Sequence, residues 1–221
     1  MHNVVSINTK SAATKTPRFS FLLCKRLFDI VFSATLLVVL LPLMLVVTCV
    51  AAYDTNGSPF FVQTRMGKNG KSFRMIKFRT MSKCAPENLS TYEFKNANDF
   101  ISPIGHILRK FSLDELPQLW NVLKGDMSFI GPRPVVLTEK DLLSLRELHG
   151  ALEVRPGITG FAQVRGRDQL PIVQKAFLDG YYARHATFLM DLKILWRTVL
   201  YVLRAEGVQD NGEQRRSTRS A

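Results

Sequence analysis

The chain has 221 residues, 46% of them hydrophobic, a length that suits one domain with an appendage. Its 30 lysines and arginines outnumber 18 aspartates and glutamates, and the net charge of +12 predicts an anionic partner such as nucleic acid, anionic lipid or a phosphorylated metabolite. Three scattered cysteines argue against a disulfide framework, and the sequence contains neither a G-x-G-x-x-G nor a Walker A loop.

Both ends of the chain are polar. Residues 1–20 carry Lys10, Lys15 and Arg18 but no acidic residue, which predicts a disordered basic arm. Residues 207–221 are polar as well, and we expect a disordered tail there. The folded part of the chain should therefore lie between these two segments.

The segment from Leu27 to Ala52 is almost entirely apolar, and Asp29 is its only charged residue. The 23 residues from Ile30 to Ala52 are long enough to span a bilayer as one helix. A cleaved signal peptide fits less well, because it needs a shorter apolar core and a small-residue cleavage site.

Pro42 divides this segment into parts of about 12 and 10 residues, each too short to span a bilayer alone. Lys25 and Arg26 precede the segment and further basic residues follow it, so the positive-inside rule places both ends on the cytoplasmic side. This symmetry favours a re-entrant membrane helix over residues 21–56, broken at Pro42. Spanning helices also tolerate proline, so a spanning helix stays open as the alternative.

Residues 58–80 have the pattern of a β-hairpin. Phe60–Met66 predicts one strand and Lys71–Thr80 the other, with Asn69 and Gly70 in the turn between them. The strands are rich in aromatic and basic residues, and the predicted turn is the strongest local signal in this part of the chain.

Lys77 and Arg79 are two positions apart, so on a strand their side chains share one face. Arginine binds phosphate groups and also forms structural salt bridges, and the sequence leaves both roles open for Arg79. For Lys68 and Lys71, beside the turn, a solvated or lipid-facing basic edge is the expectation.

The stretch Leu108–Val135 predicts a helix followed by a rigid exit. Ser112 with Glu115 three residues later has the form of a capping box. Apolar residues then recur at helical spacing as far as Gly125, which follows a lysine and ends the predicted helix. The exit contains two prolines, which stiffen it.

Asp114 and Glu115 fall in the first turn of this predicted helix, where free N–H groups and the positive end of the helix dipole gather. Arg109 precedes the pair, and Arg133 follows it between the two prolines. Carboxylates, arginines and free N–H groups together suit a phosphate and a divalent metal ion. Acidic residues at a helix start are also common as simple stabilising charges, which is the alternative interpretation.

Three further segments complete the prediction. Residues 137–150 read as an amphipathic helix. The segment Val154–Arg167 contains three glycines and a proline, which indicate tight backbone turns. Apolar residues at helical spacing from Phe188 to Leu203 predict a basic amphipathic helix that packs on the core or, as the upstream apolar segment favours, contacts a membrane surface.

The run from Ser112 to Ser128 (SLDELPQLWNVLKGDMS) and the following Gly-Pro-Arg-Pro at 131–134 closely resemble the signature of the bacterial sugar transferases. These are small polyprenyl-phosphate phosphoglycosyl transferases that begin the assembly of cell-surface glycans. Lys25-Arg26-x-x-Asp29, the KFRTM run at 77–81 and the segment 155–167 match further elements of that family. The chain departs from the family pattern at Leu41 in place of serine, Phe161 in place of tryptophan and Arg165 in place of asparagine. It also departs at residues 98–103, where a family run that contains an arginine is one residue shorter and lacks that arginine.

The resemblance implies a helix-rich α+β fold, with one catalytic domain over residues 57–206 and a short β-hairpin. It also implies an N-terminal re-entrant membrane hairpin that includes Lys25, Arg26, Asp29 and Pro42, at the cytoplasmic face of the bacterial inner membrane. The implied reaction moves a sugar 1-phosphate from a UDP-sugar to polyprenyl (undecaprenyl) phosphate and releases UMP. This is the first membrane step of exopolysaccharide, O-antigen or glycoconjugate assembly.

The resemblance also implies a division of work among the residues singled out above. Asp114 and Glu115 are the expected catalytic pair and the expected ligands of Mg²⁺, with a phosphosugar-aspartate intermediate on Asp114. Substrate phosphates are expected on Arg79, Arg109, Arg133 and Arg155, and the nucleotide on the loop Pro132-Arg133-Pro134.

Alternatives from other classes are weaker. A non-catalytic, membrane-anchored protein that binds anionic lipid would explain the charge and the apolar segment, but it would not explain the carboxylate pair. Nucleic-acid binding fits the charge alone, since recognised binding motifs are missing, and we expect no nucleic-acid partner. The sugar, the polyprenol and the oligomeric state stay open, and a homo-oligomer is compatible with the sequence.

Overall fold

The computed structural model describes residues 19–55, 57–82, 84–85, 97–166 and 170–203. The predicted tail at 207–221 and nearly all of the predicted basic arm at 1–20 lie outside these residues. Within them, eight α-helices follow in chain order: α1 Phe19–Val39, α2 Leu41–Asp54, α3 Pro103–Lys110, α4 Gln118–Lys124, α5 Lys140–Leu148, α6 Gln163–Gly166, α7 Ile172–His185 and α8 Phe188–Leu203. The strands are β1 Phe60–Met66, β2 Ser72–Phe78, β3 Ser128–Ile130 and β4 Gly157–Thr159. The predicted helix-rich α+β class is confirmed.

The apolar N-terminal segment forms two helices with a sharp bend between them. The bend between α1 and α2 measures 66°. Pro42 stands in the first turn of α2, where its missing N–H leaves a gap in the helical hydrogen bonds and its ring crowds the preceding turn. Among the described residues, only this bent pair taken together has the length and composition of a membrane span, and no individual helix does. The predicted break at Pro42 is therefore confirmed.

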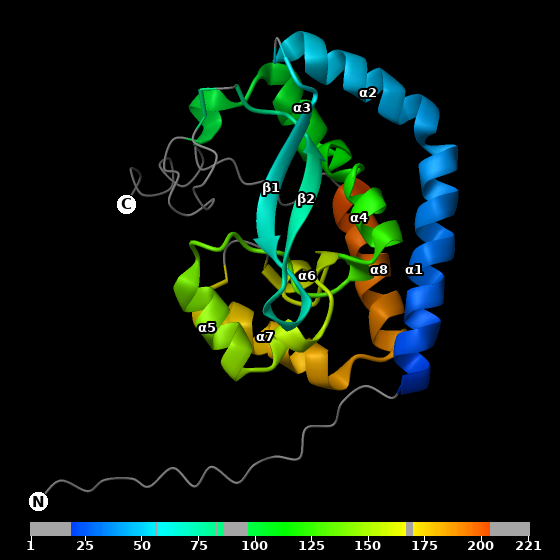
Figure 1. The fold of residues 1–221 in the computed structure, drawn as a ribbon, viewed down its shortest axis with the longest axis vertical. Helices are drawn as coiled ribbons and strands as arrows, with labels where there is room; N and C mark the ends of the chain where they lie inside the picture. The colour runs from blue at the N-terminus through cyan, green and yellow to red at the C-terminus, as the bar shows by residue number, and fades with distance from the viewer. Residues whose placement is uncertain (1–18, 56, 83, 86–96, 167–169, 204–221) are drawn as a thin grey trace, which may run out of the picture.

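The predicted β-hairpin is also confirmed. Strands β1 and β2 are antiparallel, and their register runs from Phe60 opposite Phe78 to Met66 opposite Ser72. The turn contains Asn69 at φ 55° and Gly70 at φ 72°, left-handed conformations that asparagine and glycine adopt at low cost. Figure 1 shows the hairpin in the middle of the molecule, between the bent helix pair and the helices α5 and α7.

The segment between α3 and α4 differs from the prediction. Ser112 has φ 55° and its side chain caps no helix, so the expected capping box with Glu115 is wrong. Ser112 instead follows the last turn of α3, where a left-handed residue commonly ends a helix, and its N–H donates to Arg109 O (3.0 Å). A 3-10 turn, η3, spans Leu113–Glu115, and α4 begins only at Gln118. The predicted helix end at Gly125 is confirmed by its φ of 100°.

Strands β3 and β4 form a short parallel pair deep in the molecule, with Ser128 opposite Gly157 and Ile130 opposite Thr159. Glycine is required here because the two backbones touch. A Cβ built on Gly131 would come within 2.2 Å of Arg155 O, and one built on Gly157 within 2.1 Å of Gly131 N. The glycines of the segment 154–167 thus permit close backbone contact.

The main apolar core lies between α4, β3, α7 and the inner face of α1. Its fully buried members include Val122 of α4 and Met127, and Phe28 of α1 packs against the same cluster. Figure 1 shows α1, α2 and α8 together along one side of the molecule. The helix α1 therefore belongs to the folded domain along one face and is free along the other.

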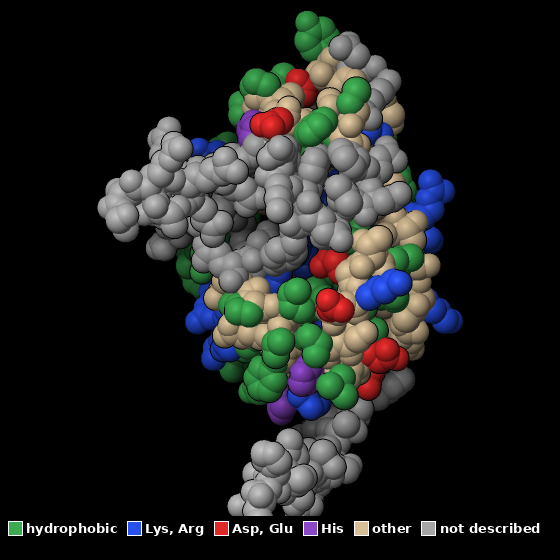
Figure 2. Space-filling view, turned by 90° about the vertical axis from the view of Figure 1, so that its left-hand side faces the viewer, with side chains coloured by type: hydrophobic (Ala, Val, Ile, Leu, Met, Phe, Trp, Pro, Cys, Tyr) green, Lys and Arg blue, Asp and Glu red, His purple; other side chains and the backbone are tan. Residues whose placement is uncertain are grey.

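The outer faces of these three helices are apolar. Leu27 of α1 is 62% exposed, Val46 of α2 is 60% exposed and Trp196 of α8 is 65% exposed. Ile194, two residues from Trp196, is buried, so α8 packs on the core with one side and presents leucines and tryptophan on the other. Figure 2 looks at a different face, where acidic, basic and apolar side chains are interspersed.

Candidate active site

Asp114 and Glu115 lie in η3, at the N-terminal approach to α4. The side chain of Asp114 is almost buried, with the whole residue 7% exposed. Leu113 and Leu116 flank the pair and pack in the apolar cluster that contains Val47 of α2. The residues that flank the carboxylates thus share an apolar cluster with the second helix of the bent pair.

Lys77 of β2 lies against both acids. Its Nζ donates to Glu115 Oε1 at 2.8 Å and lies 3.9 Å from Asp114 Oδ2. The Lys77 side chain is only 17% exposed, so solvent screens these interactions weakly. Sequence reasoning had placed Lys77 on a strand face with Arg79 without identifying the acids as its partners.

Asn121 of α4 brings this strand and this helix together. Its side chain is buried, and Nδ2 donates to Arg74 O (2.8 Å) while Oδ1 accepts from Ile76 N (3.1 Å). An amide that bonds both backbone groups of a strand edge fixes the distance and the rotation of the helix. Lys77 follows Ile76 in the chain, so Asn121 also fixes the strand position from which the lysine reaches the carboxylates.

Arg133 approaches Glu115 from another direction. Its two terminal nitrogens lie 3.3 and 3.4 Å from Glu115 Oε1. The Arg133 side chain is 45% exposed, so part of its hydrogen-bonding capacity faces solvent. Such an arginine can hold Glu115 and still meet an incoming phosphate.

The backbone of the Pro132-Arg133-Pro134 loop is anchored at three consecutive carbonyl groups. The donors come from β4, α5 and β1: Gly157 N to Pro132 O (2.9 Å), Arg146 Nη1 to Arg133 O (2.8 Å) and Arg65 Nη1 to Pro134 O (3.4 Å). The loop is therefore rigid, and its exposed residue is Arg133. This geometry agrees with a loop that presents one arginine to a ligand.

The two carboxylates have opposite electrostatic environments. Burial acts to raise the pKa of Glu115, but Lys77 and Arg133 outweigh it and lower the pKa to about 2. Burial raises the pKa of Asp114, and the charge of Glu115 adds to the rise, while Lys77 and two arginines oppose it. Glu115 is therefore a firmly ionised anchor for cations, and Asp114 is a less stabilised, more basic carboxylate.

Arg109 and Arg79 occupy different positions. Arg109 Nε donates to Thr80 Oγ1 (2.8 Å), and its charge acts on Asp114, so it belongs to the site. Arg79 follows the end of β2, donates to the carbonyl oxygens of Ser58 (3.2 Å) and Phe60 (3.4 Å), and lies 5.7 Å from the centre of the Phe61 ring. These contacts fit the structural alternative for Arg79 better than they fit a phosphate contact.

Arg155 lies at the other end of α4. Its Nε donates to Gly125 O at 2.8 Å, so it meets the C-terminal end of the helix whose N-terminal approach carries Asp114 and Glu115. The four arginines predicted to bind phosphate are thus not brought together. Arg109 and Arg133 act on the acid pair, Arg79 contacts the start of β1, and Arg155 faces a separate cavity.

The predicted membrane-hairpin residues Lys25, Arg26 and Asp29 attach α1 to three other elements. Lys25 Nζ pairs with Asp191 Oδ2 (2.6 Å), Arg26 donates to Val122 O (2.7 Å) and Leu123 O (2.8 Å), and Asp29 Oδ1 accepts from Ser128 Oγ and Phe129 N (both 3.1 Å). Asp29 is 2% exposed, and these partners satisfy its charge. The motif therefore fixes the first helix of the bent pair to the domain.

Asp114 and Glu115 are the expected ligands of Mg²⁺. The described residues contain no group of three or more His, Cys, Asp or Glu side chains that could hold a metal ion. Magnesium in phosphate-handling sites usually takes one or two carboxylates, with substrate oxygens and water completing its shell. Asp114 and Glu115 are adjacent and supply two carboxylates, so the residues present fit a magnesium ion that arrives with a diphosphate.

Two residues with a structural bearing on the site were not identified from the sequence. Asn121 looked like one polar residue on a helix, and Arg146 like a charge on an amphipathic helix. The sequence feature that marks Asn121 is a polar residue at a position of the helical pattern that is otherwise apolar. Phe161 and Arg165, which depart from the resemblance, touch each other, with the guanidinium carbon 3.8 Å from the ring centre.

Comparisons with known proteins agree with this geometry. A family model described as bacterial sugar transferase matches residues 20–205. The chain is 40% identical over 190 residues to EpsL of Bacillus subtilis, described as an uncharacterized sugar transferase, covering 85% of this chain and 91% of that protein. It is 38% identical over 190 residues to the UDP-glucose:undecaprenyl-phosphate glucose-1-phosphate transferase of Caulobacter vibrioides, covering 83% and 71%.

A third relative is longer than this chain. The UDP-galactose-lipid carrier transferase of Erwinia amylovora is 34% identical over 197 residues, which cover 83% of this chain and 41% of that protein. The chain therefore spans less than half of the Erwinia protein. The names of the Caulobacter and Erwinia relatives give different sugars, glucose for the first and galactose for the second.

Proposed function

The chain belongs to the bacterial sugar transferase family, and from this premise we propose that it transfers a sugar 1-phosphate from a UDP-sugar to undecaprenyl phosphate and releases UMP. The Caulobacter relative carries this reaction in its name, with glucose as the sugar. The product would be the first lipid-linked intermediate of exopolysaccharide or a related glycan. The observation that carries the proposal is the buried carboxylate pair with its cations, mounted against the apolar bent helix pair.

The proposed chemistry has two steps. In the first, an oxygen of Asp114 attacks the phosphorus next to the sugar, the bond to the bridging oxygen breaks, and UMP leaves with that oxygen. In the second, an oxygen of the lipid phosphate attacks the same phosphorus and releases the carboxylate of Asp114. Carboxylate nucleophiles that form acyl phosphates are known chemistry, and splitting the transfer lets UMP leave before the lipid reacts.

The surroundings of the two acids favour different roles for them. Glu115 Oε1 is held by Lys77 and Arg133, whereas the ion pair of Asp114 with Lys77 is long, at 3.9 Å. An oxygen that is not tightly hydrogen-bonded is the better nucleophile, because attack does not have to break strong bonds first. We therefore assign nucleophilic attack to Asp114 and the ordering of Lys77 and Arg133 to Glu115.

Negative charge grows on the phosphate oxygens during both steps. Arg109 and Arg133 are the side chains proposed to stabilise it, since both act on the acid pair and arginine binds phosphate in two-pronged fashion. When bound between Asp114, Glu115 and the diphosphate, Mg²⁺ would supply further charge neutralisation.

The bent helix pair is proposed to enter and leave the membrane on the cytoplasmic side. Its exposed leucines and valines, together with those of α8, form the apolar face described above. A re-entrant pair keeps η3 near the lipid boundary, because Leu113 and Leu116 belong to the same apolar cluster as Val47 of α2. The water-soluble donor and the lipid phosphate can then meet at Asp114 from opposite sides.

The test is to incubate the purified full chain with UDP-glucose, UDP-galactose and their N-acetylated relatives in the absence of lipid. Intact-mass spectrometry should detect a phosphosugar adduct with one of them, and peptide mapping should place it on Asp114. Asp114→Asn should form no adduct, while Asp126→Asn, at the other end of α4, should form it normally. UMP release that requires the lipid acceptor, without any adduct, would contradict the two-step mechanism.

A second measurement separates the enzyme from a non-catalytic lipid-binding protein. Undecaprenyl phosphate and the radiolabelled UDP-sugar should yield a lipid-linked labelled product with the native chain and none with Asp114→Asn. Lack of product with every donor tested, alongside vesicle binding, would favour the non-catalytic alternative.

A further inference from the structure

A cavity lies at the opposite end of α4 from the acid pair. It measures about 130 Å³ and is bounded by the first turns of α1, by α7, by β3 and by the chain that leads into β4. Gly125 follows Glu115 by ten residues, which at the helical rise corresponds to roughly 15 Å. Nucleotide-sized pockets have about 300–1,000 Å³, so this cavity admits a head group and not a nucleotide sugar.

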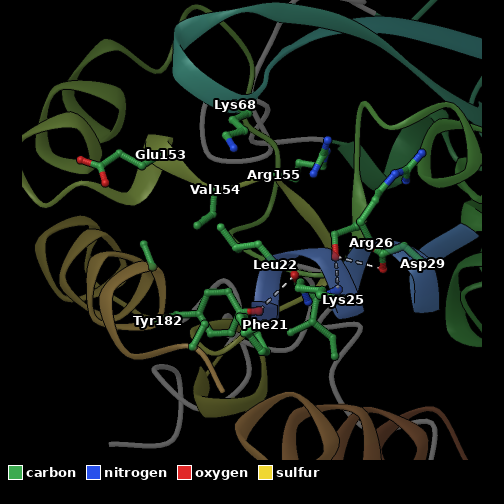
Figure 3. A pocket seen from close by; sticks show the side chains of 14 residues that line it. Phe21, Leu22, Lys25, Arg26, Asp29, Lys68, Glu153, Val154, Arg155 and Tyr182 are labelled. Atoms are coloured by element: carbon green, nitrogen blue, oxygen red, sulfur yellow. Dashed lines mark hydrogen bonds between the residues drawn. The ribbon is translucent and has the colours of Figure 1, made fainter. Parts of the chain in front are cut away.

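One side of the cavity carries three cations, as Figure 3 shows: Arg26, Lys68 and Arg155. Arg26 and Arg155 both attach to the C-terminal end of α4 and repel each other. Among the residues that the structure describes, the side chain of Lys68 has no hydrogen-bond or ion-pair partner, and the side chain of Arg155 uses only its Nε. Capping of α4 explains Arg26, but it leaves Lys68 and most of Arg155 without a role.

The acidic side chains around the cavity do not neutralise these cations. Asp191 pairs with Lys25 and also accepts a hydrogen bond from the Tyr182 hydroxyl (2.7 Å). Asp29 is engaged with the backbone and side chain of β3. The carboxylate of Glu153 lies on the far side of the cavity and is turned away from Lys68 and Arg155 (Figure 3). The net field at the three cations therefore favours an anion.

Apolar side chains make up much of the remaining lining and lead toward the apolar face of α1. Phe21, Leu22 and Val154 line the cavity below the cations. Leu23 and Leu27, on the same first turns of α1, are 61% and 62% exposed. A ligand that fits both parts has a compact anionic head and an apolar body.

We propose that this cavity binds the phosphate head group of an anionic membrane phospholipid, held by Lys68, Arg155 and Arg26, with its glycerol and acyl chains leaving past Phe21 and Leu22 toward the lipid. Lys68 lies in the turn of the β-hairpin and Arg26 in α1. The lipid would therefore clamp the hairpin to the membrane element. This site is separate from the proposed transferase site and does not depend on that activity.

The test uses the full chain in a neutral maltoside detergent and titrates water-soluble dihexanoyl-phosphatidylglycerol by calorimetry. We expect saturable binding, at least about tenfold tighter than that of dihexanoyl-phosphatidylcholine, whose head group is neutral overall. Lys68→Gln and Arg155→Gln should each weaken binding at least about fivefold, because each removes a charge-assisted hydrogen bond. Lys71→Gln is the matched control, since Lys71 is exposed in the same turn, lies outside the cavity lining and carries the same charge. It should weaken binding less than about twofold.

Other outcomes would overturn the proposal. Equal weakening by Lys71→Gln and Lys68→Gln would mean that the lipid responds only to net charge. Weakening by Arg133→Gln, with Lys68→Gln unaffected, would place the lipid at the acid pair. Inorganic phosphate that binds as tightly as the lipid would assign the cavity to a free phosphate ion. Lys68 lies on a turn, so its variant tests the site even if Arg155→Gln folds poorly.

Discussion

Asp114 and Glu115 are adjacent residues, yet the fold treats their charges in opposite ways. The pKa of Glu115 is lowered to about 2, below its ordinary value of 4.5, so ionised Glu115 stabilises the fold above pH 4.5, and this stabilisation is lost as the pH falls toward 2. Burial raises the pKa of Asp114 above its ordinary 3.8, so ionised Asp114 destabilises the fold at neutral pH. Ionised Glu115 therefore stabilises the fold, whereas ionised Asp114 lowers the stability of the fold.

This difference predicts opposite stability changes at pH 7. Glu115→Gln should lower the free energy of unfolding by about 1–3 kcal/mol, because Lys77 and Arg133 lose a buried charged partner. Asp114→Asn should raise it by roughly 0.5–1 kcal/mol, because it removes a buried charge that the fold disfavours. Thermal unfolding in detergent, followed by tryptophan fluorescence, measures both changes. Two shifts of the same sign would contradict the assignment of roles.

Lys77 provides a second prediction, on pH dependence. Lys77 is the strongest of the charges that oppose the raised pKa of Asp114, so Lys77→Gln should raise that pKa further. Attack requires the ionised carboxylate, and activity is lost as the pH falls through its pKa. The acidic limb of the kcat/KM profile should therefore move to higher pH in Lys77→Gln.

The position of the acidic limb tests this idea, and the height of the profile does not. Lys71→Gln removes an equal charge from the exposed turn of the same hairpin and should leave the limb in place. If Lys77→Gln lowered the rate equally at every pH, Lys77 would act on the substrate alone and not on Asp114.

At the level of elements, the sequence predicted what depends on local chemistry. Asn69 and Gly70 determine the hairpin turn, Pro42 determines the bend and Gly125 ends α4, each through its own backbone preferences. Ser112 was wrongly assigned because serine suits both the start of one helix and the left-handed end of another. The structure shows that Ser112 takes the left-handed position after the last turn of α3.

The sequence predicted the acid pair and Arg133 as site residues, and the structure brings them together. It did not predict that Arg155 would lie at the other end of α4, because arginines spread along the sequence carry no information about their distance in space. Nor did it predict Asn121, whose role depends on the edge of β2. Such cross-element contacts have no signature in local periodicity.

We predict that Arg146 of α5 positions the Pro132-Arg133-Pro134 loop. It is 2% exposed, pairs with buried Asp179 and donates through Nη1 to Arg133 O. Lysine keeps the charge but cannot hold Asp179 and the carbonyl together. Arg146→Lys should therefore raise the KM for the UDP-sugar about tenfold, roughly 1.4 kcal/mol, with a smaller change in kcat.

Arg184→Lys in α7 serves as the control for this substitution. Arg184 is half-buried and its Nε has no partner in the described part of the chain, so its replacement perturbs packing without touching the loop. If both variants changed KM and kcat in the same way, Arg146 would stabilise the domain generally and would not position Arg133.

At the scale of the whole molecule, the bent helix pair and the rest of the domain form one unit. Three polar side chains fasten α1 to α8, α4 and β3, and leucines beside the acid pair share an apolar cluster with α2. The anchors are themselves buried or half-buried, so removing one leaves its partner unpaired.

The topology of this unit gives the last prediction. A re-entrant pair places both of its flanks on the cytoplasmic side, whereas a spanning helix separates them. Ser20 and Ser58 are exposed and flank α1–α2, so each can carry a single cysteine after Cys24→Ser, Cys49→Ala and Cys84→Ser. Both Ser20→Cys and Ser58→Cys should react with a membrane-impermeant maleimide in inside-out vesicles and in neither case in intact spheroplasts. Labelling of one position from each side would mean that the pair spans the membrane.

In the same background, Pro42→Ala restores an N–H donor and should allow a straighter helix of about 50 Å, long enough to cross. It should therefore move one flank to the outer side in part of the population, and an unchanged pattern would mean that packing of α1 and α2 on the domain, and not the proline, determines the bend.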